Sequence, residues 1–242
     1  MSSIYTAETL ITLGIIGIVA AVTIPSLITK YQKQQTVIRL KEAYTLINQA
    51  VRLSESDNGE ISTWDYQTYS PNNGVKFAEK YFKKYLKIEK VNPYKLKFDG
   101  WKSLDGSLNK SMSYEYTRPQ FVLYNGVLIS FYPNYYSESK NRLKIGVWIF
   151  VDLNGIKGPN RFGRDVFVMS IFPNRYPGEK VVLGAHEQCG NGHIHNDGLT
   201  RDQILTHPNL CAGCNKEYTG LGYACSKLIQ LDGWQISDDY PW

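Results

Sequence analysis

The residues with the most reactive side chains, cysteine and histidine, gather in the last quarter of the 242-residue chain. They are Cys189, Cys211, Cys214 and Cys225 together with His186, His193, His195 and His207. Thiolates and imidazoles are the ligands that zinc prefers, and Cys211 and Cys214 form a C-x-x-C pair like that of a zinc knuckle. The spacing to the other candidate ligands fits no standard zinc finger, so zinc is one hypothesis among three.

Two disulfides are the hypothesis that we favour, provided that this region lies outside the cytoplasm. The sequence does not choose among the three pairings. We favour Cys189–Cys211 with Cys214–Cys225, since each bridge would close a loop with few apolar residues. A redox-active Cys211–Cys214 pair is the third hypothesis, and it lacks the helix that follows a thioredoxin motif.

Hard oxygen ligands collect in a second segment, "DLNGIKGPNRFGRD". It carries Asp152, Asn154, Asn160 and Asp165 between glycines, and Ca²⁺ needs six to eight such oxygens on a chain that can wrap around it. The spacing is not that of an EF-hand. The alternative is a turn-rich loop in which Asp and Asn bind their own backbone.

Established catalytic motifs are absent from the sequence: there is no G-x-S-x-G, no P-loop and no H-E-x-x-H. The 27 basic and 22 acidic residues are intermixed rather than gathered in a basic stripe. We therefore expect neither an enzyme nor a nucleic-acid-binding protein.

An apolar segment runs from Leu10 to Ile28, and its only polar residues are Thr12, Thr23 and Ser26. As a helix it would span roughly 28 Å, close to the thickness of a bilayer core. A cleaved signal peptide would have a basic start, and a buried soluble helix would have a polar face. A carboxylate at the entrance, Glu8, is costly near lipid unless it is paired, which makes it a candidate functional residue.

The stretch "IYTAETLITLGIIGIVAAVTIPSLI" resembles the N-terminal segment of type IV pilins and type II secretion pseudopilins. Their mature chains carry a glutamate at the fifth position and a proline seventeen residues later, the spacing of Glu8 and Pro25. The resemblance implies that a prepilin peptidase cleaves after Ser3, where the family usually has glycine, and that Ile4 is then N-methylated. It also implies that Glu8 pairs with the N-terminal ammonium of a neighbouring subunit and that Pro25 kinks or loosens the helix.

The domain organisation expected is a leader remnant at 1–3, a stem helix at 4–55 and a globular head at 56–242. Beyond Pro25 an apolar stripe continues the helix and should pack on the head; it comprises Val37, Leu40, Tyr44, Ile47 and Val51. In the head we predict a short helix over 75–88 and a hairpin over 121–132, with Asn125-Gly126 supplying the positive φ angles of its tight turn. Two further strands are predicted in "IGVWIFVDL" and "DVFVMSIF". The fold class is α+β, a long N-terminal helix on an antiparallel sheet with a disulfide-stapled C-terminal region.

The function expected is that of a minor pilin or pseudopilin, held by one membrane pass in the bacterial inner membrane with its head in the periplasm or on a surface filament. The partners implied are other pilin subunits, the prepilin peptidase, the inner-membrane assembly platform and the bilayer. Lys30 and Lys33 follow the apolar segment. By the positive-inside rule alone, these lysines would favour the opposite orientation, with the head on the cytoplasmic side. The rival hypothesis is a membrane-tethered extracytoplasmic metal-binding or enzymatic domain that uses the Cys/His cluster.

Overall fold

The chain is described here from a computed structural model, which covers residues 2–69, 73–91, 100–107, 120–138, 142–173, 178–184, 199–206, 213–215, 217 and 222–242. Its helices are α1 (Ser2–Asn58), α2 (Tyr66–Tyr69), α3 (Gly74–Tyr81), α4 (Arg201–Thr206) and α5 (Cys225–Leu231), with a 3₁₀ turn η1 (Ile61–Thr63). Its strands are β1 (Ile88–Val91), β2 (Phe121–Leu123), β3 (Leu128–Glu138), β4 (Arg142–Asp152), β5 (Val166–Ile171) and β6 (Val182–Leu183).

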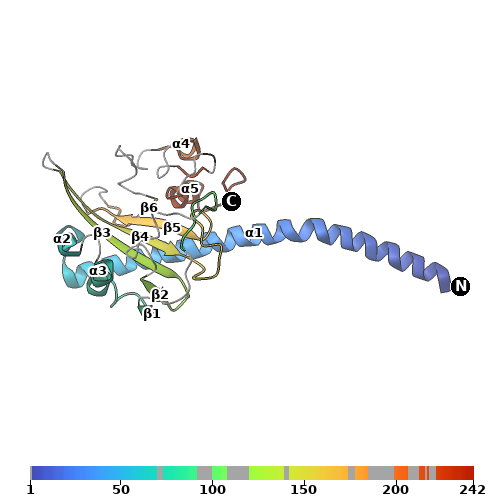
Figure 1. Cartoon of the computed structure of the whole chain (residues 1–242), viewed down its shortest axis with the longest axis horizontal. Helices are drawn as coiled ribbons and strands as arrows, with labels where there is room; N and C mark the ends of the chain where they lie inside the picture. The colour runs from blue at the N-terminus through green and yellow to red at the C-terminus, as the bar shows by residue number, and fades with distance from the viewer. Residues whose placement is uncertain are drawn as a thin grey trace.

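Helix α1 is one continuous helix of 57 residues, about 85 Å long. Figure 1 shows its C-terminal part lying along the head while its N-terminal part projects away from it. The helix ends at Asn58, a few residues beyond the predicted end of the stem. Gly59 follows with a φ of +81°, and its N–H donates to the carbonyl of Glu55 at 3.0 Å. Glycine is the residue that adopts this left-handed conformation at a helix end without steric cost.

The strands form one antiparallel sheet in which each strand pairs with the next in the chain, in the order β1-β2-β3-β4-β5-β6. The predicted hairpin is confirmed as β2 and β3, and the two predicted later strands are β4 and β5. At the hairpin turn only Gly126 has a positive φ, of +81°, whereas the sequence led us to expect one at Asn125 too. Asn125 instead accepts the N–H of Val127 through its side chain at 3.3 Å.

Both faces of the central strands are buried. Along β4, Val147, Ile149 and Val151 face the core that contains α1, while Trp148 and Phe150 belong to a second apolar cluster. Alternate side chains of a strand point to opposite faces, so a strand buried on both sides reads as a continuous apolar run. This explains the unbroken hydrophobic letters of "IGVWIFVDL".

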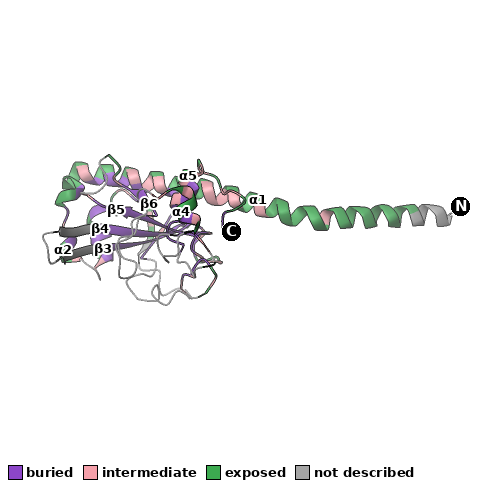
Figure 2. Ribbon diagram, turned by 90° about the horizontal axis from the view of Figure 1, so that it is seen from above, coloured by how far each residue is buried: buried purple, intermediate pink, exposed green. Residues whose placement is uncertain are grey.

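The predicted stripe on α1 packs on the sheet as expected. Leu40, Ile47 and Val51 are fully buried there, and Val37 and Tyr44 are partly buried against the same core. Figure 2 shows this half of α1 carrying its buried residues toward the sheet. A buried leucine of this kind contributes roughly 2–5 kcal/mol relative to alanine, so the stripe holds stem and head together as one body.

The predicted helix over 75–88 was too long, because α3 ends at Tyr81 and Ile88 already belongs to β1. Phe77 and Phe82 are both fully buried, although five residues of helix would turn their side chains about 140° apart. Ending the helix at Tyr81 lets Phe82 pack on Phe131, with ring centroids 4.5 Å apart. Tertiary packing therefore overrides the helical periodicity of the sequence.

Candidate functional site

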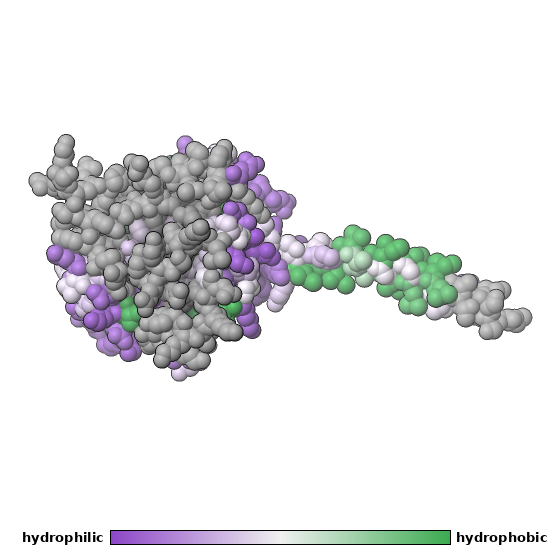
Figure 3. Space-filling model, viewed as in Figure 1, coloured by the Kyte–Doolittle hydropathy of each residue, from purple (hydrophilic) through white to green (hydrophobic). Residues whose placement is uncertain are grey.

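The N-terminal half of α1 exposes a continuous apolar surface. Leu10 keeps 69% of its surface exposed and Val22 keeps 71%. Within the described part of the chain, α1 is the one helix long and apolar enough to cross a membrane, judged by length and composition. Figure 3 shows the apolar section projecting from the head, with polar residues where the two meet. Nothing in the described head covers this surface.

The hydroxyl groups inside the apolar segment, and that of Thr29 directly after it, are satisfied by the helix itself. Three threonines donate to carbonyls four residues earlier, and a serine does so three residues earlier. These hydrogen bonds, 2.8–3.0 Å long, are Thr12 to Glu8, Thr23 to Val19, Thr29 to Pro25 and Ser26 to Thr23. The segment therefore needs no water for its polar side chains, as a lipid-facing helix requires.

The residues that the sequence selected for processing and assembly all lie on α1. Ser3 and Ile4 belong to its first turns, and Glu8 follows one turn later with its side chain exposed. Among the described residues no cation lies within ion-pair distance of Glu8. Helix α1 continues through Pro25, which has no N–H to give to the carbonyl of Ala21. Figure 1 shows a gentle curvature of α1 rather than a break.

Polar contacts fix the stem to the head along the buried half of α1. The hydroxyl of Thr36 donates to the carbonyl of Arg164 at 3.2 Å, and that of Tyr44 donates to the carbonyl of Val181 at 3.2 Å. Near the end of the helix, Glu55 forms an ion pair with Lys180. These contacts join residues more than a hundred positions apart, so the head cannot swing freely on the stem.

The predicted oxygen-rich loop does bring its four residues together. The Asp152 carboxylate accepts the indole N–H of Trp101 at 3.0 Å and the backbone N–H of Asn154 at 3.3 Å. The Asp165 carboxylate accepts the backbone N–H groups of Asn160 at 2.8 Å and Arg161 at 2.6 Å. With its amide nitrogen facing inward, Asn160 also reaches Asp152 at 3.3 Å.

Burial dominates the electrostatics of this loop. It raises the pKa of Asp152 well above its ordinary value, with the nearby charge of Asp165 acting in the same direction. Burial also raises the pKa of Asp165, against the backbone N–H groups that favour the charged form. Each carboxylate oxygen accepts an N–H donor, the arrangement of a loop that binds its own backbone. Calcium at these residues stays a prediction.

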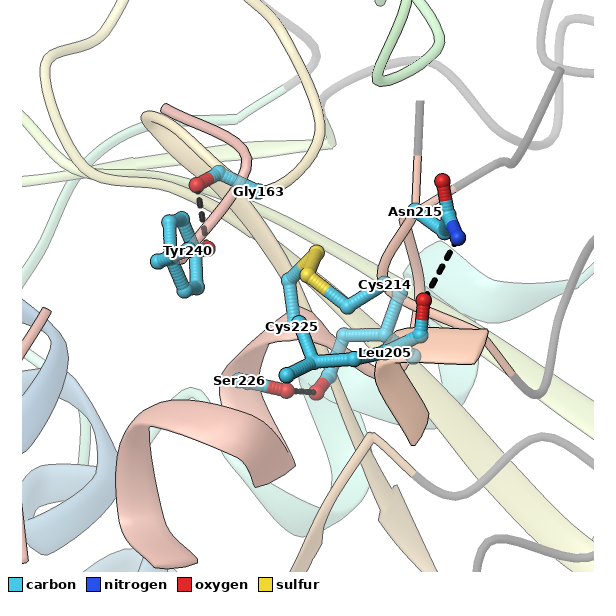
Figure 4. The surroundings of a disulfide bond; sticks show 8 residues. Gly163, Leu205, Cys214, Asn215, Cys225, Ser226 and Tyr240 are labelled. Atoms are coloured by element: carbon cyan, nitrogen blue, oxygen red, sulfur yellow. Dashed lines mark hydrogen bonds between the residues drawn. A yellow bond between two sulfur atoms is a disulfide. The ribbon is translucent and has the colours of Figure 1, made fainter. Parts of the chain in front are cut away.

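The C-terminal region carries the disulfide Cys214–Cys225, with an S–S distance of 1.99 Å. This is one of the two bridges that we favoured; Cys189 and Cys211 lie outside the described residues. Figure 4 shows hydrogen bonds around the bridge: Asn215 donates to the carbonyl of Leu205, and Tyr240 donates to that of Gly163. The buried hydroxyl of Ser226 donates to the carbonyl of Val168 in β5 at 2.9 Å. The bridge therefore joins the segment at Cys214 to the start of α5, and the Ser226 hydrogen bond ties α5 to the sheet.

The disulfide bears on the zinc and redox hypotheses, because an oxidised sulfur gives a metal no thiolate. Cys214 is bonded to Cys225 rather than paired with Cys211 in a knuckle or redox motif. All four histidines lie outside the described residues. Within those that are described, no group of three or more His, Cys, Asp or Glu side chains is arranged to hold a metal.

Sequence reasoning missed a groove of about 990 Å³ at the junction of stem and head. Its floor is α1 between Pro25 and Ile38, and its wall is the segment from Trp234 to Asp238. The C-terminal segment is held there by Arg201, whose guanidinium contacts the carboxylates of Asp232 and Asp239. The only sequence signal was the tryptophan-rich end of the chain, which gives no indication of where it folds back.

The fold and the exposed helix together define a class: an α+β head carried on one long helix whose free half is able to enter a membrane. The chain belongs to a family of unknown function, DUF6613, whose model matches residues 26–242. The match thus begins next to Pro25 and covers the head and the buried half of the stem. Searches of curated proteins and of solved structures found no match.

The raised pKa of Asp152 predicts a pH dependence of stability. An ordinary aspartate has a pKa of about 3.9. Between that pH and the raised pKa of Asp152, the folded chain keeps the Asp152 proton that the unfolded chain has lost. The contribution of Asp152 to the free energy of unfolding is therefore complete below the pKa of the unfolded chain, and it is lost as the pH rises through the pKa of the folded chain. With EDTA present, raising the pH from about 4.5 to about 8 should lower the melting temperature of the full chain in detergent relative to Asp152→Asn.

Asp202→Asn is the control, because the Asp202 side chain is 91% exposed, and its curve should follow the wild type. A wild-type advantage that grew with pH would mean that the Asp152 anion is stabilised in the fold, contrary to this account. Repeating the melt with calcium tests the metal prediction: a calcium-dependent rise that Asp152→Asn abolishes would support it.

The disulfide predicts a defined cross-link. Tryptic cleavage after Arg201, Lys216 and Lys227 leaves Cys211 and Cys214 in one peptide and Cys225 in the next. Tandem mass spectrometry of the unreduced chain should place the bond to Cys225 on Cys214. The double substitution Cys214→Ser, Cys225→Ser should lower the free energy of unfolding by about 3 kcal/mol, because the bridge closes a short loop of the unfolded chain. A bond from Cys211 to Cys225, or free thiols at 214 and 225, would contradict the pairing.

Proposed function

We propose that this protein is a pilin-like assembly subunit, anchored in a bacterial inner membrane by the free half of α1 and then built into a filament of the type IV pilus or type II secretion kind. The observation that carries the proposal is the exposed apolar surface from Leu10 to Ile28, continuous with a half-helix that is locked to the head. At roughly 25 cal/mol per Å² of apolar surface, leaving such a segment in water is strongly unfavourable. Lipid before assembly and neighbouring helices afterwards would cover it.

Glu8 has a role in this proposal that lipid alone does not explain. A carboxylate at the edge of a bilayer is stabilised by a cation, and the described residues of its own chain supply none within ion-pair distance. The N-terminal ammonium of a neighbouring stem would be such a cation. Cleavage after Ser3 and methylation at Ile4, by a prepilin peptidase, would produce that terminus four residues before Glu8.

Small residues provide a face on which two stems could approach closely. Gly14, Gly17 and Ala21 follow the spacing i, i+3, i+7 and so lie on one side of α1. A Cβ added at either glycine would meet nothing within 4 Å. Small residues permit close backbone approach between helices in lipid, which supports stem-to-stem packing in a membrane and in a filament.

The Cys214–Cys225 disulfide supports a head outside the cytoplasm, where such bonds persist. In that location the head would give the subunit its surface, and an inner-membrane assembly platform would extract the stem. We propose a structural role without catalysis or nucleic-acid binding, as a minor or tip subunit given the size of the head. No contact among the described residues favours the rival metal-binding or enzymatic domain, and two of its sulfurs are in the disulfide.

The role of Glu8 is tested by Glu8→Ala in cells that assemble the filament. We expect incorporation into sheared surface filaments to fall at least tenfold, because the incoming stem loses its charge partner, while the amount in the inner membrane is unchanged. The measurement is the ratio of filament-bound to membrane-bound protein on immunoblots.

The matched control is Glu42→Ala, which removes a carboxylate from the exposed side of the same helix and should assemble normally. Normal assembly of Glu8→Ala would refute the role of this carboxylate. Loss of membrane association in the wild type would refute the anchor itself.

A further inference from the structure

The groove between stem and head follows one face of α1. Lys30, Lys33, Val37 and Ile38 line it and lie at helical spacings of i, i+3, i+7 and i+8. The opposite wall comes from Trp234, Gln235, Ile236 and Asp238. The groove therefore has a basic section at Lys30 and Lys33 and an apolar end nearer the head at Val37 and Ile38. It lies on a face of the helix that the head leaves partly uncovered.

The position of the groove along α1 sets its depth relative to a bilayer. The apolar segment ends at Ile28, so Lys30 and Lys33 lie about 3 Å and about 8 Å further along the helix axis. The polar headgroup layer on each side of a bilayer core is about 5–8 Å thick. If Ile28 marks the edge of the core, both ammonium groups stand at headgroup level, and the lower end of the groove at Pro25 and Ser26 opens toward the acyl chains.

The charges in the groove favour an anion. Neither Lys30 nor Lys33 has a carboxylate within ion-pair distance in the described structure. The lining holds one acid, Asp238, against these two bases. Lys41 lies 5.7 Å from the ring centroid of Trp234, which adds a third cation at the upper end of the wall. Long lysine stems bury their methylenes and present the charge to the interface.

Trp234 has the character of an interfacial residue. Its ring packs on Tyr44 of α1, with centroids 5.7 Å apart, while the residue keeps partial exposure. Tryptophan and tyrosine concentrate at the boundary between lipid and water, where an apolar body and a polar edge are both satisfied. Trp234 has a φ of +63°, a conformation that bulky residues rarely adopt. The turn before Gln235 thus places an aromatic ring at the groove in spite of its backbone cost.

We propose that this groove binds the headgroup of an anionic phospholipid, with the lipid phosphate between Lys30 and Lys33 and the acyl chains along the apolar face of α1. The bound lipid would fix the height and rotation of the stem in the membrane. It would also explain why two lysines follow the apolar segment on the side of the head. The inference rests on that part of the proposed function which places α1 in a bilayer, and goes beyond it in naming the lipid class.

The test uses the full chain in detergent with equal amounts of phosphatidylglycerol and phosphatidylcholine of identical acyl chains. Native mass spectrometry counts the lipid molecules retained. We expect retention of phosphatidylglycerol over phosphatidylcholine, and the pair Lys30→Gln, Lys33→Gln should reduce that preference by about fivefold per lysine. The matched control, Lys76→Gln with Lys87→Gln, removes the same charge from exposed positions of the head and should keep the preference.

A second measurement separates the inference from the proposed function. Resistance to carbonate extraction from vesicles reports insertion of α1 and should be equal for all variants. Failure of the wild type to insert would overturn the anchor and this inference together. Insertion without headgroup preference, or equal loss in the control pair, would overturn the lipid site alone. The lipid site would also be overturned if the wild type formed a dimer without lipid and the Lys30→Gln, Lys33→Gln variant did not, because a second copy of the chain would then occupy the groove.

Discussion

The arrangement of the molecule depends on one constraint: a single rigid helix must satisfy two different surroundings. Between Leu40 and Val51 its apolar side chains are buried against the sheet, and between Leu10 and Ile28 equally apolar side chains face outward. No flexible joint separates the halves, since α1 is helical throughout. The packing of the first half therefore fixes the direction in which the second leaves the head, and whatever covers the second half positions the head as well.

The parts of the structure predicted from the sequence are those with local signals. The stripe at Leu40, Ile47 and Val51 specified which face of the helix would pack, because helical periodicity is fixed by geometry. Asn125-Gly126 located the hairpin, and the apolar run of β4 indicated a strand, although its burial on both faces was seen only in the structure. The exposed apolar segment was also predicted from the sequence, because nineteen consecutive residues without a charge are typical of a helix that enters a membrane. The roles of Glu8 and Pro25 come from a resemblance and stay proposals.

The remaining features depend on contacts between distant parts of the chain, for which the sequence has no signal. The Asp152 carboxylate accepts the indole N–H of Trp101, fifty-one residues earlier, and the loop is shaped by that buried contact as much as by its glycines. The early end of α3 follows from the packing of Phe82 on Phe131. The groove at the junction exists because the segment from Trp234 to Asp238 returns to α1, and the ionic contacts of Arg201 hold that segment in place.

Photo-crosslinking from the stem in living cells tests the central claim most directly. A photoreactive residue at Ile16, which is 58% exposed, should cross-link to lipid while the subunit waits in the membrane and to the stem of another subunit once filaments form. The same probe at Leu53, exposed on the head-bound half of α1, should give neither product. Cross-links from Ile16 to soluble proteins or to the chain's own head, with no lipid or stem partner, would contradict the account.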